Sequence, residues 1–156
     1  MKPSTTSGFL ERRRVCYARR VTTLDFTPLA DALKQLEDGL RDAREQPQSE
    51  IIRDGVIQRF EYTHELAIKL IRRTLEMVFG DPVDQMPYND VLRVAAERGL
   101  IDNVEAWFGY RTARNKTSHT YDAAVAAEVF RVAQPFVTDA RALLDHLDAI
   151  GRRAAA

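Results

Sequence analysis

The sequence has a single cysteine, no long apolar run and no net charge, and each shortage excludes a class of protein. Cys16 alone cannot form a disulfide framework or a paired-cysteine zinc module. No apolar run approaches the roughly 18 residues of a membrane-spanning helix, and residues 1–22 lack the apolar stretch of a signal peptide. We therefore expect a cytoplasmic protein without membrane contact. An apolar content of 45% argues against disorder of the whole chain.

The balance of 23 basic and 23 acidic residues conceals an uneven distribution. Residues 1–22 carry six basic residues against Glu11, a net charge of +5, and the remainder carries 17 basic and 22 acidic residues, a net charge of −5. We expect residues 1–22 to form a basic, flexible N-terminal extension, residues 23–152 one domain and residues 153–156 a tail. The extension either contacts RNA or a partner, or is only a solvated arm. The acidic body argues against specific binding of duplex DNA.

Almost every segment after residue 26 has helical periodicity, and no strand alternation of useful length occurs. The signals for helix ends are polar caps, prolines and glycines. The first predicted helix starts at Thr27, with Thr27 as cap and Pro28 in the first turn, and the second runs from Ser49 to Phe79 and ends at Gly80. The third runs from about Asn89 to Arg98. The next begins with a capping box at Asp102 and Glu105, and the last begins at Asp122, with an interruption at Pro135. The prediction is an all-α fold, an antiparallel bundle of four to five main helices.

The long second helix carries three polar features. His64 falls inside the apolar arc, and we interpret it as a hydrogen-bonded core histidine. Glu65, Lys69 and Arg73 follow at spacings of four, which favours solvated ion pairs on a surface. Glu61 lies at the edge of the arc, where it either supports a site or is solvated.

Residues 111–121 form the densest polar stretch, and its side chains suit phosphate chemistry. The fork of Arg114 can neutralise phosphodiester oxygens. A histidine side chain ordinarily titrates near ~6.5, so a residue of this type, here His119, can exchange a proton at neutral pH. Arg111, Lys116 and Ser118 are candidate substrate-binding groups. Because no acidic pair or histidine cluster lies nearby in the sequence, a metal-independent reaction is favoured, with no cofactor on the chain itself.

The spacing of Arg114 and His119 imposes a structural condition. In a continuous helix, residues five apart differ by roughly 140° around the axis and ~7.5 Å along it, so the two side chains would not face one point. Either the helix ends between them, which Thr120 and Asp122 favour, or a second subunit completes the site. A third interpretation is that the two residues only hold helices together.

Three stretches give the chain, from about Asp25 to Ile150, a resemblance to the HEPN-domain family, in the branch of HepT-like toxins and nucleotidyltransferase substrate-binding proteins. Residues 57–66 resemble a QRFEYTFEL helix, residues 95–101 resemble an A-x-x-x-G-L-I turn, and residues 114–121 fit an Arg-x4-His-x-Tyr signature. Two positions depart from the pattern: His64 replaces a phenylalanine and Ile68 a frequent tryptophan.

The resemblance implies a homodimeric HEPN-like bundle and a metal-independent endoribonuclease toxin. His119 would be the general acid and base, Arg114 would stabilise the charge on phosphorus, and Asn115 would assist orientation. The 2′-hydroxyl of RNA would be the nucleophile, leaving a cyclic phosphate and sparing DNA.

The resemblance also implies a partner, a minimal nucleotidyltransferase that acts as antitoxin. It would use ATP and magnesium to adenylylate Tyr121, adding an anion and a bulky base beside the site. The alternative within the same family is a non-catalytic subunit that binds a substrate for the nucleotidyltransferase.

Overall fold

The structure is a computed structural model that describes residues 24–155, and in this range all regular structure is helical. The elements are α2 (Thr27–Glu45), α3 (Glu50–Thr74), the π-helical turn η1 (Leu75–Phe79), the 3-10 turn η2 (Val83–Gln85), α4 (Tyr88–Glu97), α5 (Val104–Asn115), the 3-10 turn η3 (Thr117–His119) and α6 (Ala123–Ala155). The predicted all-α fold is confirmed. The predicted extension, residues 1–22, lies outside the described residues.

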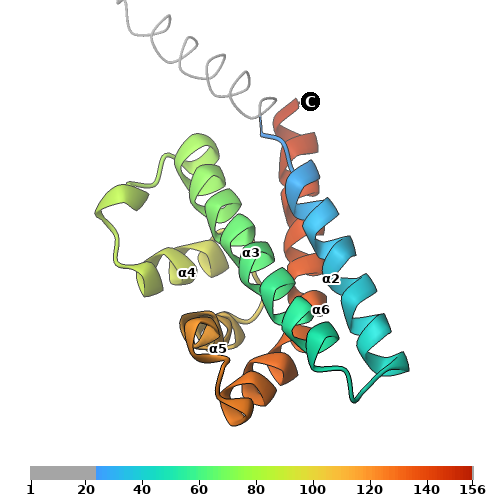
Figure 1. Cartoon of the computed structure of the whole chain (residues 1–156). Coiled ribbons are helices and arrows are strands. Elements are labelled where there is room, and N and C mark those ends of the chain that lie inside the picture. Colours follow the sequence, from blue (N-terminus) through green and yellow to red (C-terminus); the bar gives the residue numbers. More distant parts are fainter. Residues whose placement is uncertain (1–23, 156) are drawn as a thin grey trace, which may run out of the picture.

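Helices α2, α3 and α6 lie side by side, and α2 runs antiparallel to the other two (Figure 1). Helices α4 and α5 lie on the other side of α3 and run across it, and the end of α6 lies close to the beginning of α2 (Figure 1). This arrangement follows from the broad apolar arc of α3, which one neighbour could not cover. The buried residues of α3 include Val56, Phe60, Ala67, Leu70 and Ile71.

An aromatic cluster joins α3, α5 and α6 at the centre of the core. Phe136 of α6 meets Phe60 edge-on, with ring centroids 5.0 Å apart, and Tyr110 at 5.2 Å. Trp107 lies 5.8 Å from the same ring, again edge-on, a geometry that aromatic pairs favour. His64 lies among these rings with only 3% of its surface exposed, which confirms the interpretation of a core histidine.

Helices α2 and α3 approach closely at Gly39. A methyl group at this position would lie 3.1 Å from Nη1 of Arg59 and 3.2 Å from Cγ2 of Val56. Arg59 uses the approach to donate to the backbone oxygen of Gln35, at 2.6 Å, and the Tyr62 hydroxyl donates to the side-chain oxygen of Gln35, also at 2.6 Å. These bonds fix the crossing of the two helices.

Two predicted caps are confirmed, and a third helix start is one residue away. The Ser49 hydroxyl accepts from the Ile52 N–H at 3.3 Å, and the Asp122 carboxylate accepts from the Ala124 N–H at 2.8 Å. Helix α4 begins at Tyr88, directly after Pro87, and not at Asn89.

The prediction of Thr27 as a cap is wrong. Thr27 is itself the first helical residue, and Phe26 occupies the cap position without a side-chain hydrogen bond. The Thr27 N–H is instead satisfied by the Asp25 carboxylate, at 3.0 Å, which also lowers the pKa of Asp25. A polar residue beside the true boundary therefore misled the prediction.

The capping box at Asp102 and Glu105 is also wrong by one residue. Asn103 is the cap of α5, and its side chain accepts from the Ala106 N–H at 3.3 Å. The Asp102 carboxylate lies 3.1 Å from Nε2 of His146 on α6 instead.

The predicted interruption at Pro135 does not occur, because α6 continues through this residue. Proline removes a backbone donor and disfavours the preceding helical turn. Here the ring is exposed, while Ala133 and Phe136 on either side are fully buried. Core packing on both sides of the proline outweighs the local signal. The end of the α3 segment at Gly80 is confirmed, with a left-handed φ of 72°.

Within residues 24–155, none of the helices has both the length and the apolar character that crossing a bilayer requires.

The contrast between Ser49 and Thr27 predicts different effects of two alanine substitutions. Ser49→Ala removes a side-chain cap and should lower the free energy of unfolding by about 1 kcal/mol. Thr27→Ala removes no capping bond from its side chain and should change that free energy by less than about 0.5 kcal/mol. Urea unfolding of both variants measures the difference, and equal losses would contradict the cap assignment.

Candidate functional site

The α-helix is interrupted within the polar segment, between the two residues of the predicted signature. Helix α5 ends at Asn115, and η3 carries the chain from Thr117 to His119. The buried Thr117 hydroxyl donates to the Arg114 backbone oxygen at 2.8 Å, which stabilises the turn. Of the two arrangements that the spacing left open, the structure shows the one in which the helix ends between Arg114 and His119.

Arg114 is held between two carboxylates of α3. Its Nη2 donates to Glu65 and lies 3.3 Å from Glu61, while its Nη1 donates to the Thr117 hydroxyl at 3.5 Å. Its Nε is buried without a hydrogen-bond partner. With only 29% of its side chain exposed, Arg114 keeps a fixed direction.

These contacts correct two sequence-based interpretations. Glu65 is not simply a solvated member of a surface ladder, and an acidic pair does lie beside the predicted site. The pair was missed because Glu65 and Arg114 are 49 positions apart in the chain. The available signal was that Glu61 and Glu65 are one helical turn apart on one face.

Arg114 borders a pocket of about 470 Å³ between α3, α4 and α5. The pocket is lined by His64, Glu65, Ile68, Lys69, Arg72, Tyr88, Arg111, Arg114 and Asn115. Three of the candidate residues therefore meet here: Arg111, Arg114 and Asn115. Arg72 and Tyr88 also line the pocket, although no motif in the sequence marks them as part of a site.

Arg111 and Tyr88 form a stack on the α4–α5 side of the pocket. The guanidinium carbon lies 4.1 Å from the centre of the Tyr88 ring, and Nη1 donates to the Asn89 side chain at 2.8 Å. The Tyr88 hydroxyl is 3.5 Å from Nε2 of His64. Burial raises the pKa of Tyr88 to about 12, although the charge of Arg111 acts in the opposite direction.

The other candidate residues lie outside the pocket lining. His119, Ser118 and Tyr121 are exposed, and Tyr121 has 87% of its surface in solvent. The rings of His119 and Tyr121 are 6.1 Å apart and nearly perpendicular. Lys116 pairs with Glu128 of α6 at 2.6 Å and does not line the pocket.

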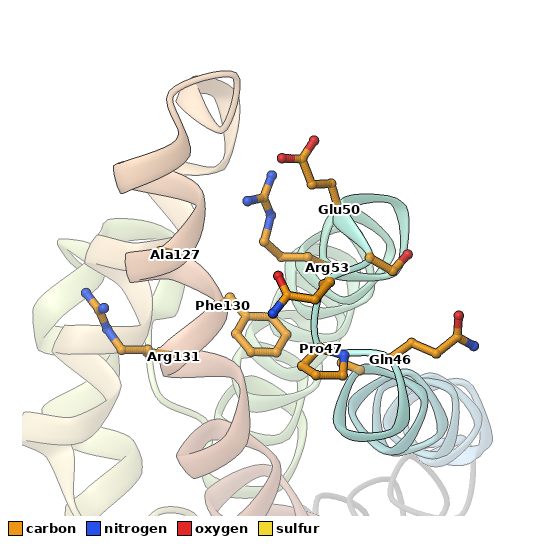
Figure 2. A pocket seen from close by; sticks show the side chains of 10 residues that line it. Gln46, Pro47, Glu50, Arg53, Ala127, Phe130 and Arg131 are labelled. Atoms are coloured by element: carbon orange, nitrogen blue, oxygen red, sulfur yellow. The ribbon is translucent and has the colours of Figure 1, made fainter.

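A second hollow, of about 350 Å³, lies between the α2–α3 turn and α6. Figure 2 shows the Phe130 ring directed from α6 toward the turn that contains Pro47, while Arg131 points away. The hollow includes none of the candidate site residues.

The fold and the site define a class: a helical bundle with a polar Arg/His segment at a helix break beside a cationic pocket. Residues 24–149 match the family model described as nucleotidyltransferase substrate binding protein like. The chain belongs to this family.

Individual relatives agree with this family. The chain is 37% identical over 95 residues to a protein of Haemophilus influenzae named probable ribonuclease HepT, a match that spans 60% of this chain and 65% of that protein. A solved structure of a Haemophilus influenzae protein aligns with a TM-score of 0.74 and 30% identity, over 80% of this chain and 99% of that one. That structure is described as revealing the fold of a substrate binding domain of a nucleotidyltransferase. A crystal structure of a Thermus thermophilus protein aligns with a TM-score of 0.59 and 29% identity, over 72% and 98% of the two chains.

The buried His64 predicts a specific dependence of stability on pH. Burial, and then the charge of Arg114, lowers the pKa of His64 from 6.5 to about 4, so the folded imidazole stays neutral. The unfolded chain, with the ordinary pKa, takes up a proton below about pH 6.5 that the folded chain does not. The free energy of unfolding should therefore fall by up to about 3 kcal/mol through His64 as the pH falls from about 7 to about 4.

His64→Phe keeps a ring in the core and removes the titrating group. Urea unfolding at several pH values should show a weaker loss of stability for this variant than for the wild-type chain. Ser49→Ala, which lowers stability without removing a titrating group, is the matched control and should retain the wild-type slope. Parallel curves for the wild type and His64→Phe would contradict the assignment.

Proposed function

We propose that the chain is a metal-independent endoribonuclease toxin that a minimal nucleotidyltransferase inactivates by adenylylating Tyr121. The name of the Haemophilus influenzae relative, probable ribonuclease HepT, supports the activity, and the family description supports the partner. RNA and ATP are the molecules required, and we expect the protein to act in the cytoplasm, where both occur.

The observation that carries the proposal is the helix break between Arg114 and His119. It leaves a fixed cation at the end of α5 and an exposed imidazole in the turn that follows. Fixed cations stabilise charge that develops on phosphorus, and an imidazole with access to solvent can take up and release protons.

In the proposed reaction, the 2′-oxygen of a ribose attacks the adjacent phosphorus and the bond to the 5′-oxygen breaks. His119 exchanges the protons as general acid and base, and Arg114 stabilises the charge on the phosphoryl oxygens. Asn115 orients the reacting group, and Arg111, Lys116 and Ser118 bind the chain of the substrate. The product is a 2′,3′-cyclic phosphate, so DNA, which has no 2′-hydroxyl, is not cut.

The proposal includes a homodimer. In one chain His119 lies on the surface, outside the lining of the pocket that holds Arg114. A second chain would bring another Arg114 and His119 toward the same cleft and enclose the reacting phosphate.

Adenylylation of Tyr121 would act at the site itself. The Tyr121 ring is 6.1 Å from that of His119, and its exposure makes the phenol accessible to another protein. The partner would supply ATP and magnesium. A linked AMP would place a negative charge and a purine where RNA has to approach His119, and both would oppose binding.

Substitution at the two central residues tests the nuclease. His119→Ala and Arg114→Ala should each reduce cleavage of tRNA and mRNA by about 10²-fold or more, because each removes a group that acts in the transition state. Cleavage should persist in a chelator, and gel analysis of labelled RNA measures the rates. His146→Ala changes another histidine, distant in the fold and paired with Asp102, and should leave the rate unchanged.

A folded wild-type chain that cuts none of these RNAs would contradict the nuclease and support a non-catalytic subunit that binds the nucleotidyltransferase's substrate. The specific observation in favour of this second function is that Glu61 and Glu65 already neutralise Arg114. A phosphate would have to compete with two carboxylates for the guanidinium.

Co-expression with the nucleotidyltransferase tests the modification. Intact-mass analysis should show adenylate additions on the wild-type chain, and Tyr121→Phe should eliminate them because no phenol oxygen remains. Tyr62→Phe is the control, since its hydroxyl is engaged by Gln35 at 2.6 Å. Unchanged additions on the Tyr121→Phe chain would contradict the site.

A further inference from the structure

We propose that the pocket between α3, α4 and α5 binds one unpaired nucleotide of RNA. Lys69 and Arg72 would hold its phosphate. Its base would lie against the stack of Arg111 on Tyr88. This inference deepens the proposed function, on which it rests for the choice of RNA, and it adds residues of α3 and α4 to the substrate-binding set.

The charge of the pocket selects an anion. Its lining contains four cations, Lys69, Arg72, Arg111 and Arg114, and one carboxylate, Glu65. Arg114 and Glu65 pair with one another, which leaves three cations facing one cavity. Residues 23–156 together carry a net charge of −5, so the pocket is a local concentration of positive charge, which attracts phosphate.

Lys69 and Arg72 are placed to share one phosphate. They are three residues apart on α3, so their side chains lie on one face of the helix. Lys69 is exposed, and within residues 24–155 its ammonium takes part in no hydrogen bond or ion pair. Arg72 donates from Nη1 to the Val83 backbone oxygen at 3.3 Å, a contact that directs the guanidinium and leaves other N–H groups for a ligand.

The stack of Arg111 and Tyr88 offers a planar surface for a base. The guanidinium is held over the ring at 4.1 Å, and its bond to Asn89 fixes the orientation before any ligand arrives. Unpaired bases in RNA stack on aromatic rings and on arginine planes, at roughly 1–3 kcal/mol per base. A preorganised surface loses little conformational entropy on binding.

The volume of the pocket and its buried lining residues also fit a nucleotide. A volume of about 470 Å³ lies within the range of sites for small molecules, roughly 300–1,000 Å³. Ile68 and the buried His64 contribute to the lining, and His64 is neutral at physiological pH because burial lowers its pKa. A concave site of this kind accepts a base that has left its stack, whereas a paired base remains inside its duplex.

Binding of an uncleavable RNA tests the inference without depending on catalysis. The probe is a fluorescent single-stranded 2′-O-methyl oligonucleotide, in which the proposed nucleophile is blocked. Lys69→Gln and Arg72→Gln in the full chain should each weaken binding about tenfold and reduce the slope of log affinity against log salt by about 1. Arg73→Gln is the matched control: Arg73 follows Arg72 on α3, is exposed and does not line the pocket, so its loss should change affinity less than twofold.

The stacking surface has its own pair of variants. Tyr88→Leu should weaken binding of the oligonucleotide about tenfold through loss of the ring, whereas Tyr88→Phe keeps the ring and should bind within about twofold of the wild type. Circular dichroism of both variants verifies the fold. Free UMP and AMP should compete with the probe more weakly than the oligonucleotide does.

Three results would overturn the inference. The first is an affinity of Lys69→Gln and Arg72→Gln for the probe that equals that of Arg73→Gln. The second is a duplex of the same sequence that binds as tightly as the single strand. The third is a free mononucleotide that competes more strongly than the oligonucleotide. Because the probe cannot be cut, absence of RNA cleavage in the separate assay would contradict the nuclease proposal and leave this binding result unaffected. Conversely, the wild-type chain could cleave RNA while the pocket variants bind the probe with wild-type affinity. That result would contradict the assignment of the pocket and leave the nuclease proposal unaffected.

Discussion

Helix α3 has to be covered on more than one side, because its apolar residues extend around a broad arc. Helices α2 and α6 cover one side, and the aromatic cluster of α5 and α6 covers another. Arg59 and Tyr62 of α3 face α2, while other polar residues of α3 lie beside the end of α5. Glu61 and Glu65 reach Arg114 at this position, so the requirement that organises the core also determines the surroundings of the candidate site.

The site therefore depends on residues far apart in the chain. Arg114 is oriented by α3, Arg111 by its stack on Tyr88 and its bond to Asn89, and Thr117 closes the turn between them and His119. Each cation is fixed by a partner from another segment or from the turn. A lone arginine on a surface helix would sample many rotamers and lose more entropy when it binds an anion.

The order and type of the helices could be predicted because periodicity and caps are local properties. Ser49, Asp122 and Gly80 act at the positions where their chemistry indicates. Predictions failed where two polar residues adjoin, as at Asp102 and Asn103, and where burial overrides a local rule, as at Pro135. In the site, the break after Asn115 was predictable, but the partners of Arg114 and the ring under Arg111 were not, because no short-range pattern encodes a tertiary contact.

The exposure of Tyr121 has a kinetic consequence. A reaction at a buried phenol must wait for the protein to open, so its rate follows the population of the open form. With 87% of its surface already in solvent, the Tyr121 ring requires no such opening. Mutations that weaken the core without changing the surface around Tyr121 should therefore leave the accessibility of its oxygen unchanged.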